Sequence, residues 1–450
     1  MGSTTSKVLR SVAVVAAFGM LAAACGSSSP SGSSTGSSST TSGGSGGGGT
    51  PTASAPGITA NSITIGSHQP LTGPAAPGYS EIAPAANALF QYVNSKGGVH
   101  GRQIKYTYED DAYNPSQTTT VVRKLVLQDN VFAIFNGLGT PTHSAVEAFL
   151  NSEKVPDLFV ASGCICWDQP SKYPYTSGWQ TDYIREGKIL GQYIKQSLSG
   201  KKVGYVYQND DFGQDGIKGL DYEIPASDVV TKQPYDVTNI NVGPQVAALQ
   251  AKGAQVVALY TIPAFTALVL LQAAKIGYHP TWVVSSVGSD PPTLSGLLTK
   301  FSSGKAGGSL LTGMVTGTYL PALNDTSNPW IALFKKIHDQ YIPTLPWDGN
   351  VLYGESVGYT FVRLMDQAGV NPTRDSVIKT LHSADLGGPG IVPFAFSSGS
   401  NAGFTGEQIA VNKDGSTLVP QGSVYTTDDS SSAPSVSNYT QPQPPSNLNS

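Results

Sequence analysis

Cysteine and charged residues are both scarce in this sequence of 450 residues. Only three cysteines occur, and Asp, Glu, Lys and Arg together make up 12% of the chain, with a formal net charge of −4. So small a net charge does not point to a nucleic acid or an anionic membrane surface as the partner. No second pair of Cys or His stands at ligand spacing from Cys164 and Cys166, so the sequence predicts no metal site there.

Long hydrophobic runs are also lacking, with one exception near the N-terminus. Lys7 and Arg10 precede residues 11–24, which carry no charge. This stretch is shorter than the roughly 20 apolar residues that a membrane-spanning helix needs. Basic residues followed by a short apolar stretch and small residues are typical of a secretory signal peptide, which we place at residues 1–24.

Cys25 follows three alanines at the end of this stretch. The segment "LAAAC" resembles a bacterial lipobox, in which the cysteine is lipidated after cleavage, although Ala22 stands where the lipobox favours Leu. Ordinary secretion after an Ala-x-Ala site, with Cys25 incidental, is the alternative. We expect a protein held by a lipid anchor on the extracellular face of the cell membrane.

Two segments are rich in Ser, Gly, Thr and Pro. They are residues 26–57, directly after Cys25, and residues 428–450 at the C-terminus. Such segments bury too little apolar surface to offset the entropy lost on ordering. We therefore expect a disordered linker over residues 25–57, which would act as a tether for the lipid anchor, and a disordered tail over residues 428–450.

Strands and helices alternate along residues 58–427. Ile63 and Ile65 alternate with polar residues, which predicts a strand. A helical face follows, which Gly97 and Gly98 end, and it carries Ile82, Leu89, Tyr92 and Val93. The same alternation recurs in "KKVGYVYQNDDFG" and "VVALYTIPAFTALVLLQ". It predicts an α/β fold with parallel sheets covered by helices on both faces, and ligands bound beyond the carboxyl ends of the strands.

Five segments, in this order, resemble the extracellular solute-binding proteins of ABC importers, of the branched-chain amino-acid type with a periplasmic binding protein type 1 fold. They are "PLTGPAA", "YVNSKGGVHGRQIK", "YEDDAYNPSQTTTVVRKLV", "GTPTHSAVEAFLNSEKVPDLF" and "QNDDFGQDG". The resemblance implies two doubly wound, Rossmann-like lobes with parallel central sheets, joined by a three-strand hinge. Lobe 1 would hold residues 58–180 and about 318–386, and lobe 2 about 181–317 and about 387–427. The crossings would lie near residues 178–183, near residues 311–319 and after Gly387.

The resemblance also implies where a ligand would bind. Two loops of lobe 1 would hold its carboxylate, and aromatic and hinge residues would surround the rest. Each position also has a plainer interpretation, because Ser and Thr cap helices everywhere and aromatic rings fill cores. The residues expected at the site are Tyr79, Gly139, Thr140, Ser162, Gly163, Gln180, Tyr183, Tyr207, Tyr260 and Ser286.

Amino-acid binders of this family carry an acidic residue on a loop of lobe 2, where it pairs with the ligand's ammonium group. The matching loop is "VVSSVGSD", in which Ser285, Ser286 or Val287 takes that position and Asp290 follows a few places later. A buried ammonium without a carboxylate is costly. The loop therefore puts an α-amino acid in doubt and leaves room for an amine-free organic or aromatic acid or a polar neutral solute.

Cys164 and Cys166 remain as an even pair if Cys25 is lipidated. An exported protein can hold a disulfide, but Cys-x-Cys closes a very small ring. The sequence leaves both a disulfide and two free thiols open.

The motifs that resemble catalytic or metal sites have simpler explanations. "GESVG" around Ser356 matches the G-x-S-x-G elbow, but residues 350–369 show the spacing of one amphipathic helix. "DDAYNP" and "NDDFGQD" are explained by turns and helix caps, and no P-loop spacing occurs.

The sequence thus predicts a monomeric binding protein that is not an enzyme and needs no cofactor or metal. Its partners would be a small solute and the permease and ATPase subunits of the importer, on separate chains. The alternatives are a ligand-sensing lobe for a signalling partner and, remotely, a serine hydrolase that uses Ser356.

Overall fold

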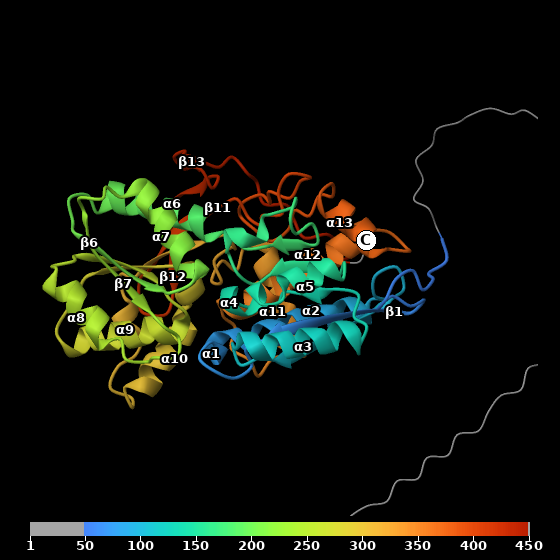
Figure 1. Cartoon of the computed structure of the whole chain (residues 1–450), viewed down its shortest axis with the longest axis horizontal. Coiled ribbons are helices and arrows are strands. Elements are labelled where there is room, and N and C mark those ends of the chain that lie inside the picture. Colours follow the sequence, from blue (N-terminus) through green and yellow to red (C-terminus); the bar gives the residue numbers. More distant parts are fainter. Residues whose placement is uncertain (1–48, 449–450) are drawn as a thin grey trace, which may run out of the picture. The chain divides into compact units, whose positions relative to one another are not determined.

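The computed structural model describes residues 49–448. The predicted signal peptide, Cys25 and most of the predicted linker lie outside the described residues. Two α/β lobes, each built on one sheet, make up the described chain (Figure 1). None of the described helices is long and apolar enough to cross a membrane.

Lobe 1 contains a five-stranded parallel sheet in the order β2-β1-β3-β4-β5. Successive side chains of β3 face opposite sides: Phe135 contacts Phe90 and Phe361, whereas Ile134 belongs to a second apolar cluster with Leu125 and Val131. Both faces of the sheet are therefore covered, as in a doubly wound fold. The strands are β1 (Ser62–Gln69), β2 (Gln103–Asp110), β3 (Ile134–Phe135), β4 (Asp157–Val160) and β5 (Thr176–Gly178).

Helices cover the two faces of this sheet in separate groups. α2 (Ile82–Ser95), α11 (Pro329–Tyr341) and α12 (Gly349–Gln367) lie together, and α3 (Pro115–Leu127) lies with the short α4 (Thr140–Ser144) (Figure 1). The sequence predicted turns and helix caps at "DDAYNP" and "NDDFGQD". The structure confirms the caps, because Asn114 caps α3 and Asp210 caps α7 (Asp211–Glu223). Short elements complete the lobe: α1 (Ala76–Tyr79), α5 (Glu147–Ser152), η1 (Ile165–Trp167) and α13 (Arg374–Leu381).

Lobe 2 contains an eight-stranded sheet in the order β13-β12-β11-β10-β9-β8-β6-β7. The strands from β6 to β10 pair in parallel, whereas β11, β12 and β13 are antiparallel additions, so the sheet is mixed rather than purely parallel. The strands are β6 (Val203–Gln208), β7 (Val229–Tyr235), β8 (Val256–Tyr260), β9 (Thr281–Val284), β10 (Val315–Thr318), β11 (Gly406–Asn412), β12 (Leu418–Thr426) and β13 (Ser435–Val436).

The helices of lobe 2 also form two groups (Figure 1). In one group, α6 and α7 approach closely because glycines face each other, and a Cβ at Gly219 would overlap the carbonyl oxygen of Ile184. The helices are α6 (Tyr183–Ser197) and α7 (Asp211–Glu223), then α8 (Gly243–Ala251), α9 (Pro263–Lys275) and α10 (Pro291–Phe301), with the short η2 (Ser286–Gly288) and η3 (Gly308–Leu311).

The chain passes between the lobes three times, and one aromatic residue marks each passage. Trp179 follows β5, Tyr319 follows β10 and Phe404 precedes β11. Their rings contact one another, with centroids 5.0 to 6.0 Å apart. The hinge thus has a hydrophobic centre, which fixes where the cleft between the lobes begins.

At the third passage, the chain changes lobe later than the boundary predicted at about residue 387. Residues 387–403, which we expected in lobe 2, bind lobe 1 instead: Gly178 N–H donates to the carbonyl of Asn401 at 2.9 Å, and Asn401 Nδ2 donates to Thr176 O at 2.7 Å. This segment satisfies the open edge of β5, which explains why it stays with lobe 1.

Both segments predicted to be disordered are ordered in part. Residues 50–57 lie against lobe 1, where Thr52 N–H donates to Asn371 Oδ1 at 2.8 Å and Thr52 O accepts from Arg102 at 2.9 Å. The tail adds β13 and accepts from the buried indole of Trp330 through Pro442 O, at 2.6 Å. Composition alone does not show such contacts, because buried donors of the lobes supply the partners that the segments lack.

Candidate ligand-binding site

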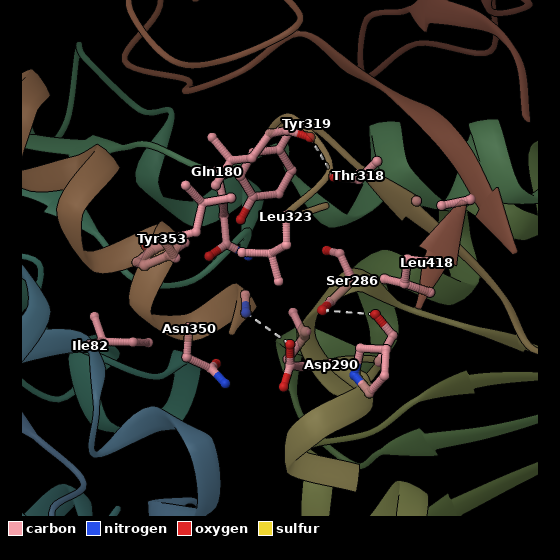
Figure 2. Close-up of a pocket in the computed structure, with 18 of the residues that line it drawn as sticks. Ile82, Gln180, Ser286, Asp290, Thr318, Tyr319, Leu323, Asn350, Tyr353 and Leu418 are labelled. Atoms are coloured by element: carbon pink, nitrogen blue, oxygen red, sulfur yellow. Dashed lines mark hydrogen bonds between the residues drawn. The ribbon is translucent and has the colours of Figure 1, made fainter. Parts of the chain in front are cut away.

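A cavity of about 370 Å³ lies between the lobes, beside the hinge (Figure 2). Lobe 1 contributes α1, the start of α4 and the first turns of α12. Lobe 2 contributes the loops after β8 and β9, the start of α10 and the turn before β12, and residues 317–324 complete the wall. Six of the ten predicted site residues line this cavity: Tyr79, Gly139, Thr140, Gln180, Tyr183 and Ser286.

Hydroxyl groups form the polar part of the wall in lobe 1. Thr140 lines the cavity at the start of α4, and its Oγ1 shares a hydrogen bond of 2.7 Å with Ser162 Oγ, which lies behind it. Gly139 has a φ of 105°, and a Cβ there would lie 2.5 Å from Thr142 Oγ1 and from the ring of Tyr113. The glycine is therefore required for the turn that presents Thr140.

Gly163 does not line the cavity, but it allows the hinge to pack. A Cβ at this position would lie 2.7 Å from Thr181 O and 2.9 Å from the ring of Tyr183. Tyr183 begins α6, and its ring contacts Phe212 with centroids 4.6 Å apart. Burial raises the pKa of Tyr183, so its hydroxyl is neutral at physiological pH.

Tyr207 and Tyr260 end neighbouring strands but do not line the cavity. The two residues are paired in register on β6 and β8. A Cβ at Gly213 of α7 would touch the Tyr207 ring, and one at Gly216 of the same helix would overlap the Tyr260 ring, so both rings face α7. The sequence shows where the strands end, but it does not show which sheet face each ring takes.

Three hydrogen bonds between the lobes involve α1 and the start of α12, and a further one runs from Gln208 Nε2 of lobe 2 to Tyr113 Oη of lobe 1 at 3.2 Å. Tyr79 Oη donates to Val287 O at 2.6 Å, and Asn350 Nδ2 donates to Thr293 Oγ1 at 3.1 Å. The third runs from Gly349 N–H to Asp290 Oδ1, at 2.9 Å. The structure therefore has its lobes closed on each other over the cavity.

Asp290 is a cavity residue that lies a few positions after the loop positions considered in the sequence. Its Oδ2 caps α10 by accepting from Thr293 N–H at 3.0 Å and from Thr293 Oγ1 at 2.7 Å. Burial, together with the charge of Asp348, raises the pKa of Asp290 to about 6. Lobe 2 therefore places one carboxyl group on the cavity wall. The hydrogen bonds that Asp290 accepts come from Thr293 and Gly349.

A second carboxylate lies behind the same loop. Glu186 on α6 is fully buried and accepts from Ser285 Oγ at 2.7 Å and from Ser286 N–H at 2.6 Å. Burial raises the pKa of Glu186, and these donors oppose that shift. Glu186 holds the Ser285–Ser286 turn in place and is not among the residues that line the cavity.

The cavity contains no cationic side chain: among the described residues that line it, none is Lys, Arg or His. Acidic groups lie near one end, where Asp348 caps α12 beside Glu81. Burial and the charge of Glu81 raise the pKa of Asp348 to about 7. At the end near α12, therefore, burial and mutual repulsion favour the protonated forms of these carboxyl groups.

Several lining residues were missed because they come from distant segments. Tyr113 lies in "DDAYNP", where a φ of 57° at a non-glycine residue signals an unusual turn. Others had no local signal in the sequence, since only the closed cleft brings them together. They are Trp347, Asn350, Tyr353 and Leu418.

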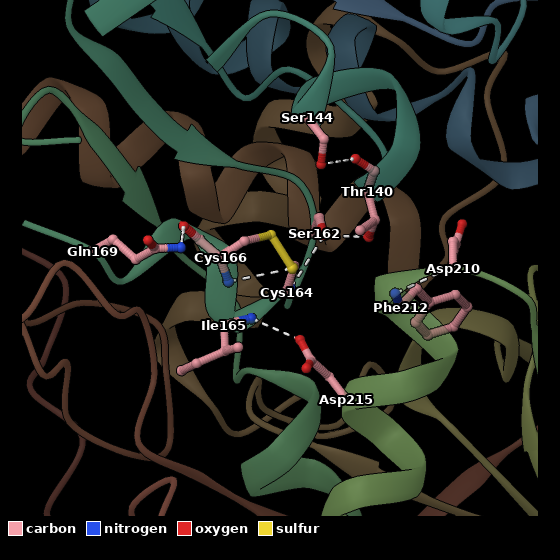
Figure 3. Close-up of a disulfide and its surroundings, with 10 residues drawn as sticks. All are labelled: Thr140, Ser144, Ser162, Cys164, Ile165, Cys166, Gln169, Asp210, Phe212 and Asp215. Carbon is pink, nitrogen blue, oxygen red and sulfur yellow. Dashed lines mark hydrogen bonds between the residues drawn. A yellow bond between two sulfur atoms is a disulfide. The ribbon is translucent and has the colours of Figure 1, made fainter. Parts of the chain in front are cut away.

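Cys164 and Cys166 are joined by a disulfide in the structure, which selects one of the two states that the sequence left open (Figure 3). The loop that they close also reaches lobe 2, because Ile165 N–H donates to Asp215 Oδ2 at 2.9 Å. A carboxylate oxygen of Asp211 lies within 4.8 Å of both sulfurs. Sulfurs in a disulfide cannot form the thiolates that bind zinc, so this group does not make a metal site.

Ser356 lies inside α12, as the helical spacing predicted. Its side chain is fully buried, and its Oγ has no hydrogen-bond partner among the described residues. An elbow nucleophile requires a sharp turn after a strand and an exposed hydroxyl. Neither is present at Ser356.

The chain matches a family profile and resembles several known proteins. The profile, described as "Periplasmic binding protein", matches residues 62–409. The "Leu/Ile/Val-binding protein homolog 7" of Brucella abortus is 24% identical over 50% of this chain and 59% of that protein. An "Amino acid binding protein" of Pseudomonas aeruginosa is 28% identical over 34% of this chain and 40% of that protein. The chain therefore spans about half the length of these curated relatives.

Solved structures share the fold over most of the chain. A fatty acid ABC transporter substrate-binding protein from Thermomonospora curvata has a TM-score of 0.71 and 23% identity, covering 86% of this chain and 97% of that one. A branched-chain amino acid ABC transporter protein from Thermus thermophilus, with bound valine, has a TM-score of 0.70 and 18% identity, covering 82% and 97%. These likenesses confirm the predicted type 1 fold with two α/β lobes.

Proposed function

Because this chain belongs to the periplasmic binding protein family, we propose that it is the lipid-anchored, extracellular solute-binding component of an ABC importer. The observation that carries the proposal is the closed cavity between the lobes. Both lobes line it, and direct hydrogen bonds cross the cleft around it.

Capture would proceed by closure of the lobes. A solute that contacts both walls stabilises the closed form by its difference in affinity between the closed and open forms. The lobes would move about the three passages marked by Trp179, Tyr319 and Phe404, whose rings contact one another. The permease would then recognise the closed form, with the ATPase on another chain.

The solute would be small and organic. Similar proteins take different solutes, since the one from Thermus thermophilus holds valine and the one from Thermomonospora curvata is a fatty acid binder. We propose an amino acid or an amine-free organic or aromatic acid, with its polar group near Thr140 and Gln180.

The anchor can be tested in the full chain. Mass spectrometry of membrane-extracted protein is expected to find an N-terminal Cys25 that carries a lipid, and Cys25→Ala is expected to release the protein into the medium. Cleavage elsewhere, or a Cys25→Ala protein that stays on the membrane, would contradict the anchor. Loss of solute uptake on deletion of the chain, with restoration by the wild-type chain, tests the role in import.

A further inference from the structure

We infer that the cavity takes a predominantly hydrophobic ligand without an amino group, whose polar end is held by hydrogen bonds rather than by an ion pair. The chemical class is that of alkyl or aryl carboxylic acids and the corresponding alcohols. This inference rests on the proposed function and narrows its solute.

The walls of the cavity are apolar on both lobes. Apolar side chains from segments that are far apart in the sequence line it: Ile82, Leu138, Ile262, Val287, Leu323 and Leu418. Figure 2 shows Leu323 drawn between the hinge residues and Ser286, and Leu418 on the side of β12. A volume of about 370 Å³ falls within the range of sites for drug-sized ligands, of roughly 300–1,000 Å³. Burial of apolar surface would therefore supply most of the affinity.

Among the described residues that line the cavity, no carboxylate is free of hydrogen bonds from the protein. The loops after β8 and β9 present Ile262, Ser286 and Val287 to the cavity. Asp290 is the one carboxylate among the described lining residues, and it already accepts three hydrogen bonds. One of them is the bond from Gly349 that holds the lobes together, so an ammonium group would compete with closure itself.

The polar groups that can hold a ligand are neutral. The amide of Gln180 makes no hydrogen bond to another described residue and lines the cavity at the first hinge passage, and Tyr319 lines it at the second. Thr140 lies on the wall of lobe 1, and Ser162 Oγ behind it shares a hydrogen bond with Thr140 Oγ1. Because no cationic side chain accompanies them, a carboxylate or hydroxyl would be held by neutral donors.

Matched probes test the inference on the mature full-length chain. Octanoate, 1-octanol and octylamine share a tail and differ in the head group, and 4-methylpentanoate is leucine without its amino group. Thermal shift and calorimetry are expected to show binding of octanoate or octanol and not of octylamine. We also expect at least tenfold tighter binding of 4-methylpentanoate than of leucine. Tighter binding of leucine or octylamine would overturn the inference, and so would a lack of binding by every amine-free probe.

The two levels of failure can be told apart. Binding of leucine or another amino acid would overturn the hydrophobic class but leave a solute-binding protein. A chain that binds no solute in a broad panel of acids, amines, amides and polyols would overturn the proposed function as well.

Two substitutions locate the effect in the cavity. Leu323→Ala is expected to weaken octanoate binding about tenfold, because it removes apolar contact area, whereas Leu127→Ala, at a side chain 55% exposed outside the cavity, leaves it unchanged. Asp290→Asn is expected to weaken all bound probes by a similar factor, since it affects closure. A selective loss of amine-bearing probes would show that Asp290 receives an ammonium group and would overturn the inference.

Discussion

Two buried sites, one in each lobe, hold acidic side chains in different ways. In lobe 1, Asp111, His68, His143 and Asp157 are all fully buried and form one hydrogen-bonded chain. The carboxylate of Asp111 lies 2.7 Å from His68 Nδ1, the two imidazoles meet at 2.9 Å, and His143 Nε2 lies 2.7 Å from Asp157 Oδ2. Because His143 belongs to α4, the chain supports the turn that presents Thr140.

The three hydrogen bonds that link these four side chains must hold three protons. When each imidazole donates to its carboxylate, a single shared proton is needed between His68 Nε2 and His143 Nδ1, because two lone pairs cannot face each other at 2.9 Å. Burial lowers the pKa of His68, and Asp111 opposes that shift. Stability here depends on complete pairing.

In lobe 2, Glu407 is buried without such partners. It lies on β11, and neither carboxyl oxygen has a hydrogen bond among the described residues. Burial raises the pKa of Glu407 well above its ordinary value, and the charges of Glu186 and Asp182 add to the shift. Burial therefore favours the protonated, neutral form of the Glu407 carboxyl group. The comparison teaches that this protein holds a buried acid in two ways, by complete pairing, as at Asp111 and Asp157, or without partners, as at Glu407 and also at Glu355 on α12 of lobe 1.

The largest effect is expected from interrupting the hydrogen-bonded series of buried side chains in lobe 1. His143→Ala removes the partner of His68 Nε2 and leaves Thr176 Oγ1 as the remaining donor to Asp157 Oδ2, which should lower the free energy of unfolding by about 3–5 kcal/mol, as for other broken buried pairs. Urea unfolding measures this loss. His279→Ala, on the surface, is the control and should change stability by about 0.5 kcal/mol or less. A loss below about 1 kcal/mol in His143→Ala would show that the chain is not energetically coupled.

A smaller, pH-dependent effect is expected at Glu407. Its pKa is higher in the folded than in the unfolded protein, so the folded state holds more protons and stability falls as pH rises above the unfolded value. The slope limit for one group is about 1.4 kcal/mol per pH unit. Glu407→Gln removes this loss.

Denaturation of both proteins between pH 5 and pH 8 tests that expectation. Glu407→Gln should gain in stability over the wild type as pH rises, with the difference smallest at pH 5. An equal destabilisation of Glu407→Gln at every pH would mean that Glu407 is ionised and paired in the folded protein.

The smallest effect is expected at Asp290, which caps α10 in lobe 2 and accepts a hydrogen bond from Gly349 in lobe 1. Its pKa is raised to about 6 in the closed form, where the cleft excludes water, so protonation favours closure. Affinity for a bound acid that stays ionised, such as octanoate, should rise modestly between pH 8 and pH 6. Asp290→Asn should reduce this pH dependence and weaken binding about threefold to tenfold. Affinity that falls on acidification in calorimetry would contradict the assignment.

Much of the fold could be predicted from the sequence, because alternation of strands and helices is a local pattern. The loops at Gly139–Thr140 and Ser286 followed from the ends of strands. Tyr207 and Tyr260 did not line the cavity, because a strand end does not reveal the sheet face that a ring takes. The cross-cleft contacts of Asp290 and Gly349 depend on residues 59 positions apart and leave no local pattern.

The hydrogen-bonded series that contains His68 and His143 also could not be predicted from the sequence. The two histidines stand 75 residues apart, in segments without metal-ligand or catalytic spacing. The ordered tail was missed for another reason: Pro-rich sequence suggests disorder, but its carbonyls accept from donors such as Trp330 that the lobes would otherwise leave unpaired.

The most direct test of the account is the distance between the lobes in solution. Spin labels at Gln117→Cys on α3 and Ala247→Cys on α8, in a Cys25→Ala background, report that distance without involving the bonded Cys164 and Cys166. We predict that octanoate shortens and narrows the distance distribution, whereas octylamine leaves it unchanged. A distribution that no solute alters, or one that only the amine narrows, would contradict closure around an amine-free ligand.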